Sequence, residues 1–283
     1  MSIVLKKRGR PTKADVAARE QIVAKATKKR TDEEILGDLK ERFRILGILA
    51  QGTVNKNIRA VTITGAPGVG KTYTVEKVLA DAKEKKNISY EVIRGAISAV
   101  NLYKLAYRNR KAGSVVVLDD ADSIFNDEDA LNILKVLCDS SDVRQVSWMK
   151  ESQTLKDEDI PQSFEFNGAI IFISNLDFQT FVDEGKNKYA QHFEALMSRS
   201  LYLDLRLHNR NDLGVWIEHV AQDGAIFKRE GLTPDEGKLV LNFLRQYRSD
   251  LRELSLRTLL KTSQLVKTHK DWENLARILL LKH

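Results

Sequence analysis

The chain has 283 residues, a length that suits one large domain or two small ones with a well-formed core. The net charge is +7, and no apolar run is long enough to span a membrane. A single cysteine, Cys138, excludes an internal disulfide, and five scattered histidines show no metal-ligand spacing. Residues 1–5 are too short for a signal-peptide core. We therefore expect a protein of the reducing cytoplasm without a membrane partner, and Cys138 as a small buried thiol.

Positive charge is concentrated at the amino terminus. Residues 1–30 hold ten Lys/Arg and two acidic residues, a net of +8, so the rest of the chain sums to −1. Within this arm, Lys7, Arg8, Arg10 and Lys13 belong to the stretch KKRGRPTK, which resembles an AT-hook. In that motif the two arginines enter the narrow A·T minor groove and the lysines hold phosphates. We predict a flexible DNA-binding arm, and the alternative is a non-specific basic tether.

Strands and helices alternate through the middle of the chain. A helix is predicted to start at residues 31–34 and to continue through Leu49. Strands are expected at 60–64, 88–93, 114–118, 169–174 and 201–205, with helices at about 71–84, 98–110, 127–139 and 188–198. Continuous β-branched runs in these strands indicate a parallel sheet that is covered on both faces. The alternation predicts an α/β sandwich.

From about His208 no strong strand pattern remains. Helices are predicted at roughly 211–229, 234–247, 250–268 and 271–281. The predicted organisation is thus a basic arm over 1–30, an α/β domain over 31–207 and a helical domain over 208–283.

A phosphate-binding P-loop pattern, G-x-x-x-x-G-K-T, stands between the first strand and its helix. Its members are Gly65, Ala66, Pro67, Gly68, Val69, Gly70, Lys71 and Thr72. The glycines let backbone N–H groups turn toward a polyphosphate, Lys71 reaches the terminal phosphates, and the Thr72 hydroxyl is a ligand for Mg²⁺. The following helix directs its positive end at the same phosphates. The pattern predicts a site for ATP and Mg²⁺.

Polar residues at the ends of two later strands fit the same chemistry. Asp119 and Asp120 end an apolar strand, where Asp119 suits the Mg²⁺ shell and Asp120 suits polarisation of an attacking water. Asn175 follows the next long strand, and its amide is placed to orient that water; the alternative is a turn-forming asparagine. Arg199 cannot easily reach its own site and would enter that of a neighbouring subunit in a ring. The alternative for Arg199 is a surface arginine that caps a helix.

Together these elements resemble the AAA+ superfamily of ring-forming ATPases, over about residues 35–283. The resemblance equates the P-loop with Walker A, Asp119-Asp120 with Walker B, Asn175 with sensor 1, and Ser198-Arg199 with the trans-acting arginine finger of clamp-loader and initiator-like members. It implies the strand order 5-1-4-3-2, a C-terminal helical lid, and assembly into a homo-oligomeric ring, expected to be a hexamer. In the lid, Leu254-Ser255-Leu256-Arg257 looks like sensor 2, which makes Arg257 a contact to the γ-phosphate; Arg252 is the alternative.

One residue departs from the family pattern. The family usually has Asp-Glu in Walker B, whereas the second acid here is Asp120, one methylene shorter. Slow hydrolysis, suited to a switch, is the expected consequence, and Asp122 is an alternative base. The compact layout also resembles small bacteriophage-encoded AAA+ proteins, which would place the chain in the host cytoplasm.

Two loops bear on the substrate. Residues 94–100 lack the aromatic pore residue of protein-threading AAA+ members, which argues against an unfoldase. Residues 140–168 form an insertion with Arg144, Trp148 and Lys150, at a position where DNA-acting members often carry a hairpin. An exposed Trp148 would stack on bases. The alternative is a tryptophan that anchors the hairpin to the body.

The leading hypothesis is an oligomeric AAA+ ATPase that acts on DNA or a DNA-bound complex, in replication, recombination or helicase loading. A second hypothesis is a protein-remodelling chaperone or unfoldase with a protein client, in which the arm serves only for localisation. A third is a nucleotide switch that hydrolyses ATP slowly.

Overall fold

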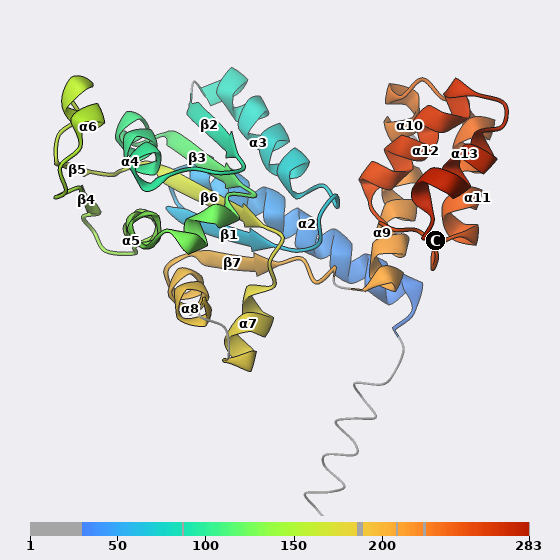
Figure 1. The fold of residues 1–283 in the computed structure, drawn as a ribbon, viewed down its shortest axis with the longest axis horizontal. Coiled ribbons are helices and arrows are strands. Elements are labelled where there is room, and N and C mark those ends of the chain that lie inside the picture. The colour runs from blue at the N-terminus through green and yellow to red at the C-terminus, as the bar shows by residue number, and fades with distance from the viewer. Residues whose placement is uncertain (1–29, 87, 186–188, 208, 223–224, 283) are drawn as a thin grey trace, which may run out of the picture.

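The computed structural model describes residues 30–86, 88–185, 189–207, 209–222 and 225–282. They form a sheet layered between helices and, beside it, a helical C-terminal part (Figure 1). The predicted DNA-contacting residues Lys7, Arg8, Arg10 and Lys13 lie outside the described residues.

Five parallel strands make the central sheet. They are β1 (Ala60–Thr64), β2 (Ser89–Arg94), β3 (Ser114–Asp119), β6 (Ala169–Ser174) and β7 (Leu201–Asp204). Their order is β2-β3-β6-β1-β7, and every neighbouring pair is parallel. Numbered along the chain as strands 1 to 5, this is the predicted order 5-1-4-3-2. The order puts the carboxyl ends of β1, β3 and β6 side by side at one edge, where a ligand site of an open α/β sheet is expected.

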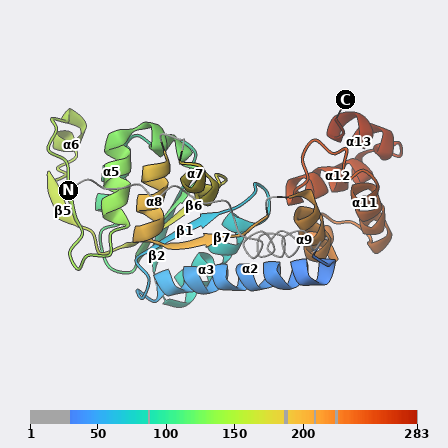
Figure 2. The same ribbon diagram turned by 90° about the horizontal axis from the view of Figure 1, so that it is seen from below.

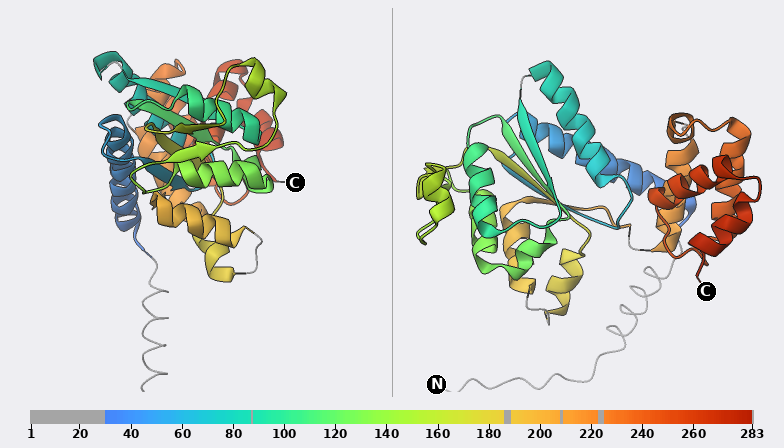
Figure 3. Two further views of the ribbon diagram at one scale, coloured as in Figure 1. Left: turned by 90° about the vertical axis from the view of Figure 1, so that its left-hand side faces the viewer. Right: turned by 45° about the horizontal axis from the view of Figure 1, so that its top comes forward.

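Helices cover both faces of the sheet, which explains its unbroken apolar strands (Figures 2 and 3). One face packs against α2 (Asp32–Val54) and α3 (Lys71–Lys86). The other packs against α4 (Ala99–Arg108), α5 (Glu128–Leu137) and α8 (Ala190–Arg199). Every residue of β1, β3 and β6 is buried, so these strands carry core side chains on both faces rather than an alternating pattern. The α/β fold class is confirmed.

Local sequence signals set the boundaries of several helices. The Thr31 side chain accepts from Glu34 N while the Glu34 side chain accepts from Thr31 N, a capping box that starts α2 as predicted. Cys138 lies directly after α5 and is 1% exposed. Burial raises the pKa of its thiol to about 12. Cys138 is therefore a core side chain rather than a reactive thiol.

The insertion at 140–168 is a small antiparallel ribbon at the far end of the sheet from the helical part (Figures 1 and 2). It contains β4 (Gln145–Ser147), α6 (Gln153–Asp157) and β5 (Ser163–Glu165). Trp148 is only 9% exposed and its ring centroid lies 6.0 Å from that of Tyr103. This burial fits the anchoring alternative and not an exposed base-stacking side chain. Lys150 is exposed and donates to Asp129.

The remaining described segments are the η1 turn (Asp122–Asn126), α7 (Phe178–Glu184) and the C-terminal helices α9 (Arg210–Gln222), α10 (Ala225–Arg229), α11 (Pro234–Gln246), α12 (Leu256–Thr268) and α13 (Trp272–Leu280). The C-terminal helices bury their own apolar cluster, which includes Ile217, Val240, Phe243 and Leu259. The helix predicted over 250–268 begins only at Leu256, because Ser255 acts as the N-cap and accepts from Thr258 N. No helix in the described part of the chain is long and apolar enough to cross a bilayer.

Candidate nucleotide-binding site

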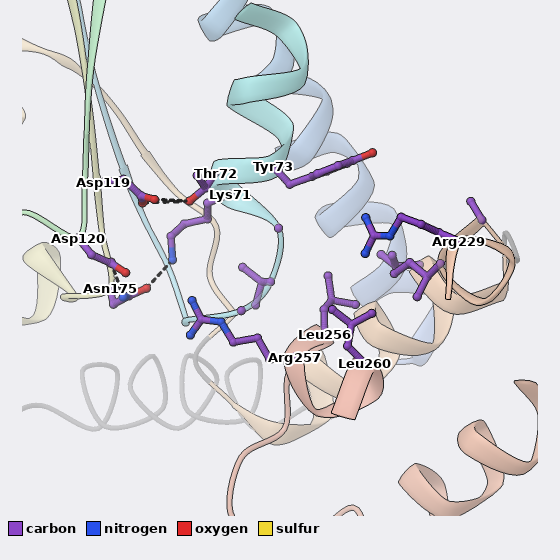
Figure 4. Close-up of a pocket in the computed structure, with 16 residues that line it drawn as sticks. Lys71, Thr72, Tyr73, Asp119, Asp120, Asn175, Arg229, Leu256, Arg257 and Leu260 are labelled. Carbon is purple, nitrogen blue, oxygen red and sulfur yellow. Dashed lines mark hydrogen bonds between the residues drawn. The ribbon is translucent and has the colours of Figure 1, made fainter. Parts of the chain in front are cut away.

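A cavity of about 410 Å³ lies between the carboxyl edge of the sheet and the helical part (Figure 4). This volume falls in the range of small-molecule and cofactor sites. Its lining brings together the predicted residues Gly68, Val69, Gly70, Lys71, Thr72, Asp119, Asp120, Asn175 and Arg257. Parallel strand order explains the convergence, because β1, β3 and β6 each deliver their last residue to the same edge.

The P-loop needs glycine for two separate reasons. Gly68 and Gly70 have φ values of +67° and +105°, a region that side chains with a Cβ rarely adopt. At Gly68 a Cβ would also lie 2.8 Å from the Cβ of Ser255, so the helical part approaches the loop too closely for a side chain. Leu256 N donates to Gly68 O at 2.9 Å, and Trp216 Nε1 donates to Val69 O at 2.9 Å. The C-terminal helices thus hold the P-loop directly.

Lys71 is the central cation of the cavity. It is 5% exposed, and its Nζ donates to Gly65 O at 2.6 Å, Ala66 O at 2.9 Å and Asn175 Oδ1 at 2.7 Å. Burial lowers the pKa of Lys71 to about 8, and the nearby Asp120 carboxylate only partly opposes this shift. A polyphosphate in the loop would offer Nζ charged acceptors in place of neutral ones, which favours the protonated amine. The residues therefore fit a phosphorylated ligand.

Thr72 and Asp119 form a pair that fits Mg²⁺. Thr72 Oγ1 donates to the two carboxylate oxygens of Asp119 at 2.9 and 3.0 Å. Burial raises the pKa of Asp119, and a bound cation would act in the opposite direction. Magnesium at phosphates is usually held by one or two protein oxygens, with waters and phosphate oxygens for the rest. This pair supplies such oxygens at the foot of the P-loop.

Asp120 and Asn175 contact each other in the wall of the cavity. Asn175 Nδ2 donates to Asp120 Oδ1 at 2.5 Å while its Oδ1 accepts from Lys71. Asp120 has a φ of +53°, a left-handed conformation that aspartate and asparagine adopt more readily than other residues with a side chain. This backbone gives a physical reason for Asp rather than the longer Glu at this position. Asp122 accepts from Ser174 Oγ at 2.8 Å and does not line the cavity, so Asp120 is the better-placed acid.

The two candidate lid arginines occupy different places. Arg257 is exposed at the start of α12, lines the cavity, and points toward Lys71 and Asn175 (Figure 4). Its charge acts on Lys71, lowering the pKa of that amine slightly further. Arg252 instead donates through Nε to Leu281 O at 2.7 Å, at the end of α13. The geometry thus favours Arg257 over Arg252 as the lid cation.

Arg199 lies apart from this cavity. It ends α8, immediately before β7, and its Nη1 donates to Ala195 O at 3.0 Å. The position is at the amino edge of the sheet, whereas the P-loop of the same chain follows the carboxyl end of β1. The structure therefore does not bring Arg199 to its own nucleotide site.

Comparison with known proteins agrees with this geometry. A protein-family sequence model described as "ATPase family associated with various cellular activities (AAA)" matches residues 61–149. These residues include the P-loop and Asp119-Asp120. A protein of Enterobacteria phage T4, described as an uncharacterized 36.7 kDa protein in the nrdC-mobD intergenic region, is 37% identical over 249 residues. That match covers 88% of this chain and 76% of the phage protein. The chain belongs to the AAA family of ATPases.

Solved structures of related fold are more distant. A DNA replication initiation factor shares 17% identity with a TM-score of 0.43, covering 85% of this chain and 61% of that one. The Aeropyrum pernix Orc1 protein in complex with DNA shares 13% with a TM-score of 0.47, covering 84% and 64%. A Rhizobiales Trip13 shares 12% with a TM-score of 0.37, covering 95% and 96%. This AAA chain spans less than two thirds of the length of the initiation factor and of the Orc1 protein. Sequence identities and TM-scores this low carry no information on function.

The apolar end of the AAA nucleotide cavity could not be predicted from sequence patterns. This end is lined by Tyr73, Val220, Ala225, Ile226, Leu256 and Leu260, and the Arg229 cation lies beside these apolar side chains. Tyr73 directly follows the P-loop and is 62% exposed, while the others come from α9, α10 and α12. Such a wall suits a nucleobase, since ligand pockets are mostly apolar with a few placed polar groups. Only the adjacency of Tyr73 to the P-loop was available as a sequence signal.

Proposed function

We propose that this AAA protein binds ATP with Mg²⁺ and hydrolyses it as an oligomer that acts on DNA or on a DNA-bound complex. One observation carries the catalytic part: the hydrogen-bonded series Lys71–Asn175–Asp120 lies in one cavity beside the Thr72–Asp119 pair. These are the groups that a phosphoryl-transfer site needs, because its catalysis rests on positioning and on stabilising phosphate charge.

Each side chain has a distinct role in the proposed reaction. The P-loop and Lys71 hold the phosphates, and Arg257 adds positive charge from the lid. Thr72 and Asp119 would hold the Mg²⁺, which neutralises charge on the phosphates when bound. Asp120 accepts the proton of the attacking water, and Asn175 fixes the orientation of that carboxylate.

The position of Arg199 supports assembly as a requirement for hydrolysis. An arginine at the opposite sheet edge can complete a nucleotide site only from a neighbouring copy, as in a head-to-tail ring. We expect Arg199→Ala to lower the ATPase rate by about 10³-fold while leaving ATP affinity within a few-fold of wild type. Steady-state hydrolysis and equilibrium binding, measured above and below the assembly concentration, check this. Wild-type activity of Arg199→Ala in dilute monomers would refute the role.

The DNA part of the proposal rests on the charge distribution. The first thirty residues carry +8 and the rest of the chain −1, so a polyanion partner is expected at the arm. A slowly hydrolysing switch is the second candidate function, favoured by the short Asp120 side chain. The relative from phage T4 is consistent with action in the cytoplasm of a host cell.

An ATPase assay with and without duplex and single-stranded DNA tests this proposal. We expect DNA to stimulate hydrolysis several-fold, and the stimulation to vanish when Lys7, Arg8, Arg10 and Lys13 are replaced by glutamine, because the arm then loses four cations that would contact the groove and the phosphates. Basal hydrolysis without DNA should stay unchanged in that variant. Stimulation by an unfolded protein, with no response to DNA, would establish the protein-remodelling alternative instead.

A further inference from the structure

A second cavity lies at the opposite edge of the sheet from the nucleotide site. Its volume is about 600 Å³, and its floor is made by the amino ends of β1, β3 and β6 through Arg59, Ser114 and Ala169. Strands of five or six residues separate the two cavities, which corresponds to about 17–20 Å. Among the residues that the structure describes, none lines both cavities.

The second cavity is strongly basic. Five cations line it, and the only carboxylate among the described lining residues is Glu165. The cations are Lys56, Arg59, Arg110, Lys111 and Arg144. Among the described residues, none of the five forms an ion pair with a carboxylate. Since residues 31–283 sum to −1, this cluster is a local concentration of charge and not a general property of the body. We call it the basic pocket.

Arg144 is the fixed cation of the basic pocket. It is 4% exposed, donates to Leu137 O at 2.7 Å and Gly168 O at 2.6 Å, and lies over the Phe166 ring. Burial and the neighbouring Arg59 together lower its pKa to about 10, so the guanidinium still remains charged at neutral pH. The Asp139 carboxylate opposes this shift only in part, and an anion in the cavity would further compensate the buried charge.

The other four cations differ in how many contacts hold their side chains. Arg59 donates to Ser141 O at 2.6 Å, and Arg110 lies over the Tyr107 ring, 3.9 Å from its centroid. Lys56 and Lys111 are exposed, and their amines have no hydrogen-bond or ion-pair partner among the described residues. The five side chains come from three separate connections, namely α2–β1, α4–β3 and α5–β4. This distribution suits several phosphates along a chain better than one small anion.

We propose that the basic pocket binds phosphates of a nucleic-acid backbone and forms a second DNA contact in addition to that of the arm. The inference rests on the proposed action on DNA and gives the body of the protein a direct part in it. Phosphate contacts from arginine, lysine and buried guanidinium groups fix position on a duplex without reading its sequence. The pocket therefore orients the ATPase body on DNA that the basic arm captures.

The test measures binding of a fluorescent duplex to the full chain by anisotropy over a range of salt concentrations. The pocket variant is Lys56→Gln with Lys111→Gln, which removes two exposed cations and no described hydrogen bond of their side chains. The matched control is Lys40→Gln with Lys270→Gln, two exposed lysines elsewhere with the same change in charge. The arm variant described above completes the set.

We expect the pocket variant to bind DNA about tenfold to a hundredfold more weakly at 0.1 M salt, with a salt slope shallower by about 2, because each duplex phosphate contact adds about 0.9 to that slope. The control should bind like wild type. If wild type binds no DNA, the proposed function fails. If wild type binds and only the arm variant loses affinity, the pocket proposal alone fails. Unchanged DNA affinity with weakened self-association in the pocket variant would make this face a subunit contact and would also overturn it.

Discussion

Replacement of Lys71 by methionine is expected to lower the affinity for ATP by about 10- to 150-fold, because hydrogen bonds to charged groups contribute about 1.5–3 kcal/mol. Lys71 is the buried cation of the P-loop, and its present acceptors are two carbonyls and the Asn175 amide. Methionine has a similar length and keeps the apolar stem packed, so the loss falls on the ligand rather than on the loop. Calorimetric titration with Mg-ATP measures the affinity.

Thermal denaturation provides the control for folding. A ligand that binds only the native state stabilises it by an amount that grows with the logarithm of ligand concentration over Kd, so wild type should gain stability with Mg-ATP and Lys71→Met should gain less. Without nucleotide the two proteins should melt at similar temperatures, because the variant also removes the cost of burying a charge. A variant that keeps wild-type affinity would exclude Lys71 as a phosphate ligand.

The pKa of Lys71 adds a pH dependence to the same interaction. Burial sets this pKa at about 8 in the free protein, and bound phosphates favour the charged amine, so binding raises it. Affinity is therefore fully present below pH 8 and falls as pH rises above 8, with net proton uptake on binding in that range. Titrations in two buffers of different ionisation enthalpy detect the proton. Lys71→Met should show neither the uptake nor the decline.

Replacement of Asp120 by asparagine is expected to lower ATP turnover by about 10²- to 10⁴-fold, the usual contribution of a positioned general base. Asparagine is isosteric, tolerates the left-handed backbone at this position, and keeps an oxygen to accept from Asn175 Nδ2. It removes the carboxylate charge and with it the capacity to take a proton. ATP affinity should therefore stay within a few-fold of wild type, as measured by calorimetry beside steady-state phosphate release.

Asp122→Asn is the matched control for Asp120. It makes the same chemical change two residues away, on a carboxylate that accepts from Ser174 and lies outside the cavity. We expect it to retain turnover within a few-fold. Strong loss in Asp122→Asn with normal turnover in Asp120→Asn would exchange the two roles. If wild type turns over slowly and Asp120→Asn turns over at the same slow rate, the result would indicate the nucleotide switch.

The sheet and the phosphate-binding end of the site could be predicted because their signals are local. A strand buried on both faces is mostly apolar, which made the centres of β3 and β6 visible as continuous apolar runs. The P-loop is one continuous octapeptide, and Asp119 and Asn175 each follow such a run directly. Parallel strand order then brought these chain positions to one edge.

Choices between neighbouring residues required the tertiary structure. Spacing did not separate Asp120 from Asp122 or Arg257 from Arg252, because the members of each pair are only a few residues apart and their contacts follow from the fold. Trp148 reads equally well as a base-stacking or a core residue until its burial is known.

The sequence by itself determined the α/β class and the strand order through the family resemblance, and it contained the complete P-loop pattern. Only the tertiary structure revealed the apolar wall of the nucleotide cavity and the basic pocket. Both are built from segments far apart in the chain, such as Lys56 with Arg144 and Tyr73 with Leu260. No local pattern marks such a surface, because it exists only after the sheet has brought its loops together.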